Sequence, residues 1–339
     1  MKRFLAILTL VSLFLTGCAD PEPQQKQYTA TFLDVFDTVT TIVGRSDNQE
    51  DFEAAAQIVH DELLFYHRLF DIYNTYDGIS NLKTVNDQAG IAPVTVDETI
   101  IQLLLDCKAY YTATGGRVNA FMGSVLQLWH EARNDGLDDP VHAYLPDADA
   151  LAEAASHTDP NAVIIDEAAS TVYIADPQLR LDVGAIAKGW AAQQVTKNAP
   201  TGLLISVGGN VCATGPKDAS GTPWVVGIQD PDGGDYLHTL YVTGGSIVTS
   251  GDYQRAYAVD GVVYHHIIDP DTLYPSLHWR SVTIVCADSA LADALSTALF
   301  LLPLEEGQQL LTTMGAEAMW VNARGEIFYS PGFQKLIRT

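Results

Sequence analysis

The sequence is poor in basic residues. Its 339 residues include 18 Lys and Arg against 42 Asp and Glu, which gives a formal net charge of −24 at pH 7. A protein that binds nucleic acid needs a basic surface to meet the phosphates. The composition therefore argues against a nucleic-acid partner and leaves proteins and small molecules.

Cysteines are also scarce, and they are not spaced as metal ligands. Only four occur, and Cys107, Cys212 and Cys286 each lie among apolar or small neighbours. The sequence contains no close Cys spacing typical of a zinc site and no HExxH motif. We expect buried free thiols at these three positions, with a disulfide between two of them as the alternative.

A hydrophobic run long enough to cross a bilayer comfortably is missing too. Residues 4–15 are apolar and follow Lys2 and Arg3, an arrangement typical of an export signal and too short for a membrane span. The run ends in Leu-Thr-Gly-Cys at residues 15–18, which resembles the bacterial lipobox. We expect residues 1–17 to be a lipoprotein signal peptide and Cys18 to anchor the protein to the outer face of the cell membrane. A plain secretory signal is the alternative.

Residues 18–27 contain Pro, Gln and acidic residues and almost nothing apolar to bury, so they are predicted to form a tether. No second stretch of this composition and no internal repeat follows. Residues 28–339 are therefore predicted to form one large domain with subdivisions.

The hydrophobic pattern predicts an α+β fold with a mixed, largely antiparallel sheet and packed helices, because several strands follow one another without a helix between them. Residues 72–90 are crowded with Asn, Asp, Gly and Ser and are predicted to be mostly loop. Helices are expected at residues 50–69, 97–111, 185–195 and 290–302, and strands at residues 203–207, 224–228, 247–249, 262–268 and 282–285.

Two segments carry glycines where a backbone could approach a ligand. Residues 181–190 read LDVGAIAKGW, which predicts a short strand that enters a helix through a small-residue turn, with Asp182 at the strand end and Lys188 on the first helical turns. Residues 205–210 read ISVGGN, a buried strand that ends in paired glycines and could face a phosphate. The plainer alternatives are a capping Asp, a solvated Lys and a simple bend.

Two further segments carry candidate reactive groups. Asp293 and Thr297 are four residues apart in a predicted helix, so a carboxylate and a hydroxyl project from one face and offer the oxygen ligands that magnesium accepts. A solvent-exposed face is the alternative. Residues 264–270 read YHHIIDP, where one histidine near a reacting hydroxyl could act as a proton acceptor.

Taken together, these segments resemble the ApbE family, the FAD:protein FMN transferases. The resemblance covers nearly all of the predicted domain, and weaker matches are Phe36-Asp37-Thr38 and Tyr73. The stronger matching stretches occur in the family's order at residues 181–190, 203–209, 249–253, 266–270 and 292–299.

The resemblance implies that a Thr or Ser hydroxyl of an acceptor protein attacks the FMN phosphate of FAD with the help of Mg²⁺, so that AMP is released and FMN stays attached. It implies that Asp293, Thr297 and the backbone carbonyl of Ala185 hold the metal, and it suggests His266 as the proton acceptor. The residues implied to line the flavin nucleotide site are Phe36, Tyr73, Arg117, Val118, Asn119, Asp182, Lys188 and Ile268.

The implied acceptors are proteins of membrane electron-transfer complexes, such as Rnf-like or Nqr-like subunits, and FMN-binding domains. The chain has no complete copy of the family's acceptor pattern, so self-modification is not expected. Two departures from the family pattern are visible. Asn119 stands where many members have an acidic residue, next to the additional positive charge of Arg117, and Ser296 stands where some members have a further acidic residue beside the metal.

Two other functions remain open. Water could replace the acceptor hydroxyl, which would make the chain an FAD pyrophosphatase that releases FMN and AMP with the same metal and nucleotide residues. A lipid-anchored flavin-binding protein without catalytic activity would share the fold but not the chemistry.

Overall fold

The computed structural model describes residues 25–339. The predicted signal peptide and the predicted lipid anchor at Cys18 lie outside the described residues, so both stay predictions. Strand β1 begins at Lys26, so the last two residues of the predicted tether belong to the sheet. None of the helices in residues 25–339 is long and apolar enough to cross a membrane.

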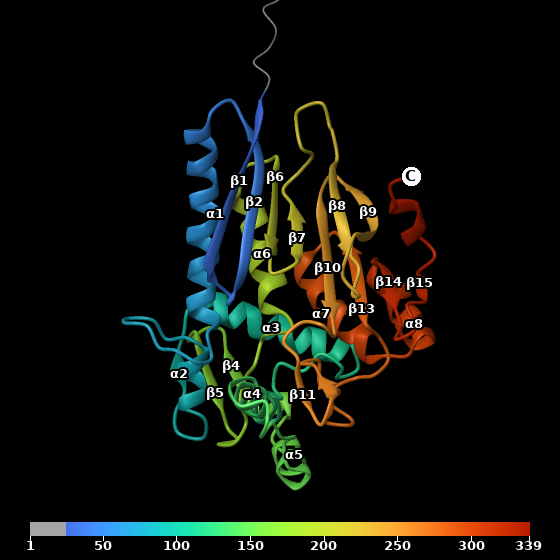
Figure 1. Cartoon of the computed structure of the whole chain (residues 1–339). Helices are drawn as coiled ribbons and strands as arrows, with labels where there is room; N and C mark the ends of the chain where they lie inside the picture. The colour runs from blue at the N-terminus through green and yellow to red at the C-terminus, as the bar shows by residue number, and fades with distance from the viewer. Residues whose placement is uncertain (1–24) are drawn as a thin grey trace, which may run out of the picture.

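An eight-stranded sheet, in which every neighbouring pair is antiparallel, forms the centre of the fold (Figure 1). Its order is β1-β2-β6-β7-β10-β13-β14-β15, which confirms the α+β prediction. The strands are β1 (Lys26–Val35), β2 (Thr38–Ser46), β6 (Leu203–Val207), β7 (Asn210–Ala213), β10 (Gly245–Gly251), β13 (Ser281–Cys286), β14 (Glu317–Val321) and β15 (Ile327–Tyr329).

Both faces of the sheet are covered. In β14, Ala318 and Trp320 pack with the helices, whereas Met319 and Val321 pack on the opposite face, because successive strand residues point to opposite faces. The helical face carries α1 (Gln49–Phe70), α6 (Ala187–Asn198), α7 (Ser289–Leu301) and α8 (Leu304–Met314), and the opposite face carries the hairpin of β8 (Trp224–Gln229) and β9 (Tyr236–Val242) with the 3-10 helix η2 (Phe333–Leu336).

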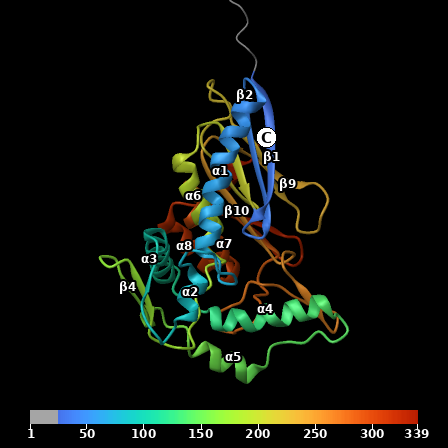
Figure 2. The ribbon, with the colours of Figure 1, turned by 90° about the vertical axis from the view of Figure 1, so that its left-hand side faces the viewer.

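A second, mostly helical region lies below the sheet (Figure 2). It contains a three-stranded sheet and a short hairpin, and α4 and α5 lie at its base (Figure 2). Its elements are α2 (Leu82–Asp87), β3 (Val94–Thr95), α3 (Glu98–Ala113), α4 (Gly123–Asp138), α5 (Ala148–Ala155), η1 (Pro160–Ala162), β4 (Val163–Asp166), β5 (Thr171–Ile174), β11 (Tyr257–Val259) and β12 (Val262–Tyr264).

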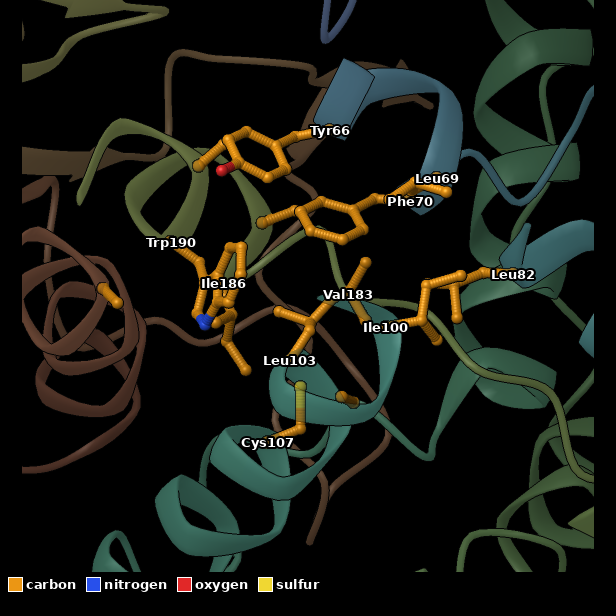
Figure 3. Close-up of a cluster of buried hydrophobic side chains, with 14 of the residues drawn as sticks. Tyr66, Leu69, Phe70, Leu82, Ile100, Leu103, Cys107, Val183, Ile186 and Trp190 are labelled. Carbon is orange, nitrogen blue, oxygen red and sulfur yellow. The ribbon is translucent and has the colours of Figure 1, made fainter. Parts of the chain in front are cut away.

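The core between the two regions is built around Trp190 of α6 (Figure 3). The rings of Tyr66 and Phe70, at the end of α1, approach the indole edge-on at centroid distances of 5.6 and 5.5 Å. The indole N–H donates to the carboxylate of Asp106 at 2.8 Å. Leu103 of α3 packs in the same cluster, so the start of α6 is fixed by both regions.

Most predicted elements are present. The helices predicted at 50–69, 97–111 and 290–302 correspond to α1, α3 and α7 within two residues at each end, and the strand at 203–207 coincides with β6. The prediction of loop over residues 72–90 missed the short helix α2, which begins after Asn81 because the Asn81 side chain accepts a hydrogen bond from the Thr84 N–H.

Two local predictions were wrong. Residues 181–186 form no strand, because the backbone groups of Leu181 hydrogen-bond to the Asn86 side chain and the Asp182 N–H donates to the Ala120 carbonyl. Helix α6 accordingly begins at Ala187 rather than at residue 185. The strand predicted at 262–268 ends at Tyr264, since the following residues turn away to line a cavity.

Cys107, Cys212 and Cys286 are buried and free, which excludes the alternative of a disulfide among them. Burial raises the pKa of the Cys212 thiol to about 12, and the same thiol donates to the Ser289 hydroxyl at 3.1 Å. These thiols therefore pack as small apolar side chains.

Replacing Leu103, which is 0% exposed, with Ala leaves a cavity beneath Trp190. We expect the free energy of unfolding to fall by about 2–5 kcal/mol. The matched control is Leu33→Ala, since Leu33 lies on strand β1 and its side chain is 73% exposed, and we expect a change within about 0.5 kcal/mol. Urea denaturation of the two variants measures the difference, and equal effects would contradict this placement of the core.

Candidate functional site

A cavity of about 420 Å³ opens where the sheet meets the lower region. The tips of the β1–β2 and β6–β7 hairpins, the segment 181–188, α7, α4 and the loops after β10 and β12 all line it. A cavity of this size fits the usual range of small-molecule sites.

The two hairpin tips meet at the cavity wall. Phe36 and Asp37 connect β1 to β2 with positive φ angles of 54° and 50°, which non-glycine residues rarely adopt. A Cβ on Gly208, at the tip of β6–β7, would lie 2.6 Å from the Thr38 hydroxyl oxygen. Glycine is therefore required at 208, and Gly208 lines the cavity together with Phe36, whereas Gly209, the second glycine of the predicted pair, does not.

The segment before α6 presents Asp182 to the cavity. This carboxylate is buried and accepts the Gly184 N–H at 2.8 Å. The same turn brings Ala185 to the cavity wall, and Lys188 lies one turn further along. The Lys188 ammonium donates to the Gly184 carbonyl at 3.3 Å, so the turn and the first residues of α6 form one unit.

Helix α7 contributes a carboxylate and a hydroxyl. Asp293 is 4% exposed, and its Oδ2 accepts the Gly189 N–H of α6 at 2.7 Å. Burial raises the pKa of this carboxyl, and the charge of Lys188 and the Gly189 N–H partly oppose that effect. Thr297 lies one helical turn later and lines the same cavity. This arrangement rules out the alternative in which the two side chains form a solvent-exposed face.

These groups fit a magnesium ion. A cation would favour the charged form of the buried Asp293 carboxylate, and Thr297 and the carbonyl of Ala185 are hard oxygen donors at the same cavity wall. Within residues 25–339, no group of three or more His, Cys, Asp and Glu could hold a metal ion. The donor set is therefore small, as is usual for magnesium that keeps water and phosphate ligands, and unlike a zinc site.

The two neighbouring histidines, His265 and His266, differ in how many of their ring nitrogens are hydrogen-bonded. His265 is 7% exposed, donates from Nε2 to the Ser276 carbonyl at 2.7 Å and accepts the Ile267 N–H on Nδ1, so both ring nitrogens are used. The Nδ1 of His266 lies 3.0 Å from the Gln254 carbonyl. A carbonyl only accepts, so Nδ1 carries the proton and Nε2 keeps its lone pair. Burial and then the charges of Arg255 and Lys188 lower the pKa of His266 to about 3.

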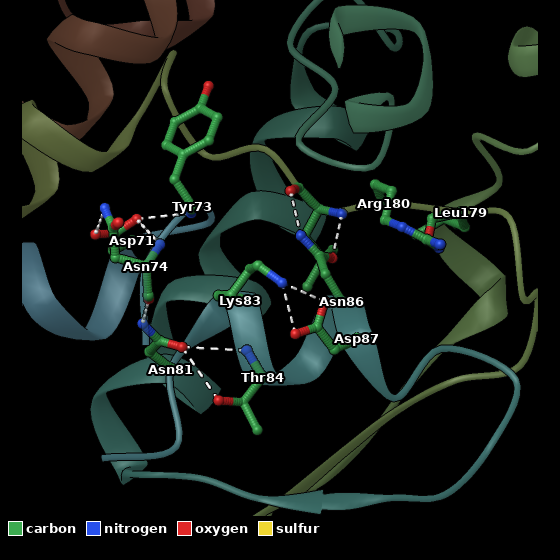
Figure 4. Close-up of polar contacts among 11 residues, drawn as sticks. Asp71, Tyr73, Asn74, Asn81, Lys83, Thr84, Asn86, Asp87, Leu179 and Arg180 are labelled. Atoms are coloured by element: carbon green, nitrogen blue, oxygen red, sulfur yellow. Dashed lines mark hydrogen bonds and ion pairs between the residues drawn. The ribbon is translucent and has the colours of Figure 1, made fainter. Parts of the chain in front are cut away.

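A tight loop after α1 holds Tyr73 at the cavity mouth (Figure 4). The Asp71 carboxylate accepts the backbone N–H groups of Tyr73 and Asn74 at 2.7 and 3.0 Å and the Tyr76 hydroxyl at 2.7 Å. The Tyr73 side chain projects away from this cluster and is 58% exposed. Its hydroxyl lies 2.8 Å from Nδ1 of His130, and the centroids of the two rings are 6.3 Å apart.

Of the three predicted residues at 117–119, two line the cavity and one does not. Arg117 lines the cavity, but ion pairs with Asp269 and Asp271 at 3.3 and 2.5 Å counter its charge. Asn119 also lines the cavity and accepts the Phe121 N–H at 2.9 Å, so its amide shapes the turn. The Val118 side chain packs in the core and does not line the cavity.

The structure brings the other predicted site residues to this one cavity. The residues that line it are Phe36, Tyr73, Arg117, Asn119, Asp182, Ala185, Lys188, His266, Ile268, Asp293 and Thr297. Ser296 lies outside it, because its hydroxyl donates to the Asp293 carbonyl at 2.8 Å and contacts the Ser250 hydroxyl.

Sequence reasoning missed several lining residues, chiefly His130 and Arg133 of α4 and Arg255. Helix α4 was not among the predicted elements, so its polar face went unnoticed. Arg255 follows the segment 249–253 by two residues, and that proximity was the available signal. Burial lowers the pKa of His130, while the nearby Asp182 opposes the effect.

Helices α6 and α7 touch at Gly189, whose N–H donates to the Asp293 carboxylate. A Cβ there would lie 2.4 Å from the Asp293 Cβ and 2.4 Å from the Ser289 carbonyl oxygen. We expect Gly189→Ala to lower the free energy of unfolding by about 1–3 kcal/mol and to displace the Asp293 carboxylate.

The control is Gly307→Ala in α8, where the nearest atom would be a flexible Leu299 methyl at 3.3 Å. Alanine should stabilise that helix by up to about 1 kcal/mol. Thermal unfolding and Mg²⁺ titration of both variants test the contact. If Gly189→Ala bound magnesium as tightly as the wild type, the Gly189 contact would not set the position of the Asp293 carboxylate.

Comparisons with known proteins agree with this architecture. A model of the ApbE family matches residues 36–320. The FAD:protein FMN transferase of Treponema pallidum is 37% identical over 279 residues, covering 76% of this chain and 75% of the relative. One from Klebsiella pneumoniae is 33% identical, covering 73% of this chain and 78% of the relative.

Solved structures have the same fold. The ApbE protein from Thermotoga maritima superposes with a TM-score of 0.81 at 31% identity, covering 93% of this chain and 100% of the other. The flavin transferase ApbE from Vibrio cholerae has a TM-score of 0.75 at 21% identity, covering 92% of this chain and 99% of the other, a likeness of fold alone. The match of the family model over most of the chain, together with these relatives, shows that the chain belongs to the ApbE family.

Proposed function

We propose that this chain is an FAD:protein FMN transferase, which moves FMN from FAD onto a Thr or Ser hydroxyl of an acceptor protein and releases AMP. One observation carries the proposal: Asp293, Thr297 and the free Nε2 of His266 belong to a single cavity that cationic side chains also line. Two curated relatives, which are 37% and 33% identical to this chain over the aligned residues, bear the same activity in their names.

Transfer of a phosphoryl-type group depends mainly on positioning and on neutralising charge. Magnesium, held by Asp293, Thr297 and the Ala185 carbonyl, would supply most of that neutralisation. Lys188 lies at the same end of the cavity, since its charge acts on Asp293. It would therefore face the diphosphate, while Asp182 and the Tyr73 ring would position other parts of the nucleotide.

His266 suits the role of proton acceptor. Its Nδ1–H is held by the Gln254 carbonyl, which orients the ring and leaves Nε2 available to take the proton of the acceptor hydroxyl. The low pKa keeps the ring neutral in the absence of substrate. A bound diphosphate would counter the charges of Arg255 and Lys188 and make the ring a stronger base.

The proposal includes where the protein acts and which acceptor proteins it modifies. The lipobox-like pattern at residues 15–18 supports a lipid anchor through Cys18 on the extracytoplasmic face of the cell membrane. Acceptors at that location would be proteins of membrane electron-transfer complexes, Rnf-like or Nqr-like subunits or FMN-binding domains.

The deciding experiment mixes purified protein, FAD and Mg²⁺ with a tagged acceptor protein and measures acceptor mass and AMP. We expect one FMN on a threonine or serine for each AMP released. Stoichiometric AMP release without an acceptor would favour FAD hydrolysis, and binding of FAD with neither product would favour a flavin-binding protein.

Asp293→Asn removes the negative charge and keeps the shape. We expect the transfer rate at a fixed Mg²⁺ concentration to fall by about 10²–10³, and FAD binding to lose its dependence on Mg²⁺. The fold should tolerate the change, because burial already disfavours the charged form of this side chain. Asp138→Asn, at an exposed position of α4, is the matched control. Unchanged magnesium dependence in Asp293→Asn would rule out this metal site.

His266→Ala should lower the transfer rate by about 10²–10⁴, whereas His142→Ala, at an exposed ring, should leave it unchanged. Because the pKa of His266 is about 3 in the free protein, its Nε2 lone pair stays available well into the acid range. We therefore expect kcat/KM for FAD, which reports the protein before FAD binds, to show no loss with an apparent pKa near the ordinary histidine value of about 6.5. A loss there that disappears in His266→Ala would contradict the low pKa of the ring, whereas an unchanged transfer rate in His266→Ala would contradict its role as proton acceptor.

A further inference from the structure

The loop after β10, residues 252–255, orients His266. Its Gln254 carbonyl lies 3.0 Å from Nδ1 of His266, and Gln254, Arg255 and His266 all line the cavity. Arg255 has a positive φ of 46°, a conformation that non-glycine residues rarely adopt. Such a conformation persists only where surrounding contacts impose it. The loop therefore needs contacts outside the cavity that hold the carbonyl in place.

Arg280, directly before β13, supplies two of those contacts. The Asp252 N–H donates to the Arg280 carbonyl at 2.9 Å, and Nε of Arg280 lies 2.9 Å from Oδ2 of Asp252. The Arg280 N–H in turn donates to the Val321 carbonyl of β14 at 2.7 Å. Asp252 is thus tied through its backbone and its side chain to a residue that is itself fixed to the central sheet.

The turn between β8 and β9 holds the rest of the Arg280 guanidinium. Nη1 donates to the Asp232 carboxylate at 2.7 Å, and Nη2 donates to the Pro231 carbonyl at 3.2 Å. All three guanidinium nitrogens therefore have partners, which fixes the planar group in one orientation. Asp252 consequently pairs with a rigid group rather than with a mobile side chain.

The stability of the fold does not explain the Asp252 carboxylate. Its side chain is 24% exposed and that of Arg280 is 27% exposed, and ion pairs at partly exposed positions add little to the free energy of unfolding. Burial raises the pKa of Asp252, while the charge of Arg280 opposes that effect. Its Oδ1 is buried and accepts no hydrogen bond from any of residues 25–339, which is costly. The geometry of the loop is the better explanation of a carboxylate at this position.

We propose that Asp252 and Arg280 are positioning residues for FMN transfer, because their ion pair fixes the loop in which the Gln254 carbonyl holds His266 with Nε2 free. The inference rests on the proposed transferase function and extends the set of residues on which that function depends. Neither Asp252 nor Arg280 lines the cavity, so both act through His266 and not by contact with FAD, the metal or the acceptor.

Asp252→Ala removes the ion pair at the loop. We expect kcat for FMN transfer to fall about tenfold or more, which is part of the effect of a general base. KM for FAD and the dependence on Mg²⁺ should change less than about threefold, since the nucleotide and metal donors stay in place. Asp252→Asn keeps an oxygen that can accept from Nε of Arg280, so it should recover most of the rate. Acceptor mass at saturating FAD measures kcat.

A double variant shows whether the effect passes through His266. In a His266→Ala background, Asp252→Ala should change the residual rate less than about twofold, because the ring that it positions is gone. A fall in that background as large as in the wild type would overturn the proposal, and so would an unchanged kcat in the single variant Asp252→Ala.

Asp218→Ala is the matched control. It breaks the ion pair with Arg45 at 3.4 Å, whose side chains are 30% and 20% exposed for Arg45 and Asp218, and neither residue lines the cavity. This variant should keep the kcat of the wild type. Thermal unfolding checks that each variant is folded at the assay temperature.

Nuclear magnetic resonance of protein labelled with ¹⁵N-histidine gives a reading that does not depend on activity, with the signals of His266 identified from their loss in His266→Ala. We expect a protonated Nδ1 and an unprotonated Nε2 in the wild type, and a mixture of both tautomers in Asp252→Ala. Wild-type signals in Asp252→Ala would overturn the positioning role. If Asp252→Ala changes the tautomer while the wild type modifies no acceptor protein, the transferase function fails and the link from Asp252 to His266 stands.

Discussion

The hydrogen bond from the Gly189 N–H to the Asp293 carboxylate, 104 positions apart in the chain, is the contact on which the site depends. A buried carboxylate is costly unless it is hydrogen-bonded or meets a cation. The missing side chain at Gly189 lets α7 approach α6 closely enough for the backbone to supply one donor. The same approach brings Ala185 and Lys188 to the cavity wall that Asp293 and Thr297 also line, so one packing contact brings the proposed metal donors and a cation together.

Packing on either side fixes the positions of the two helices, α6 and α7, that make this contact. Trp190 follows Gly189 and is fixed by Tyr66 and Phe70 of α1 and by the Asp106 carboxylate of α3. The sheet fixes α7 from the other side through β10 and β13. The start of α6 therefore cannot shift without disturbing the core that joins the two regions, which keeps the proposed metal ligands in place.

The distribution of charge within the cavity reverses that of the whole chain. The molecule is strongly acidic, yet Lys188, Arg133 and Arg255 all line one cavity. Cations gathered in an acidic protein attract anionic ligands to one place and give little affinity for polyanions elsewhere. His266 lines the same cavity, and the charges of Arg255 and Lys188 both lower its pKa.

The amino-acid sequence by itself determined the α+β class, most of α1, α3, α7 and β6, and eleven of the residues that line the cavity. It could do so because hydrophobic period and glycine turns are local and because five motifs in order point to one family. Only the tertiary structure decided which alternatives hold. It showed that Asp293 and Thr297 face a cavity rather than solvent, that His265 is saturated and His266 is not, and that Val118 belongs to the core. It also turned the expected strand before α6 into a segment held by Asn86 and Ala120, and it added Arg133 from an unpredicted helix. These outcomes depend on hydrogen bonds and packing between segments far apart in the chain, which no local pattern encodes.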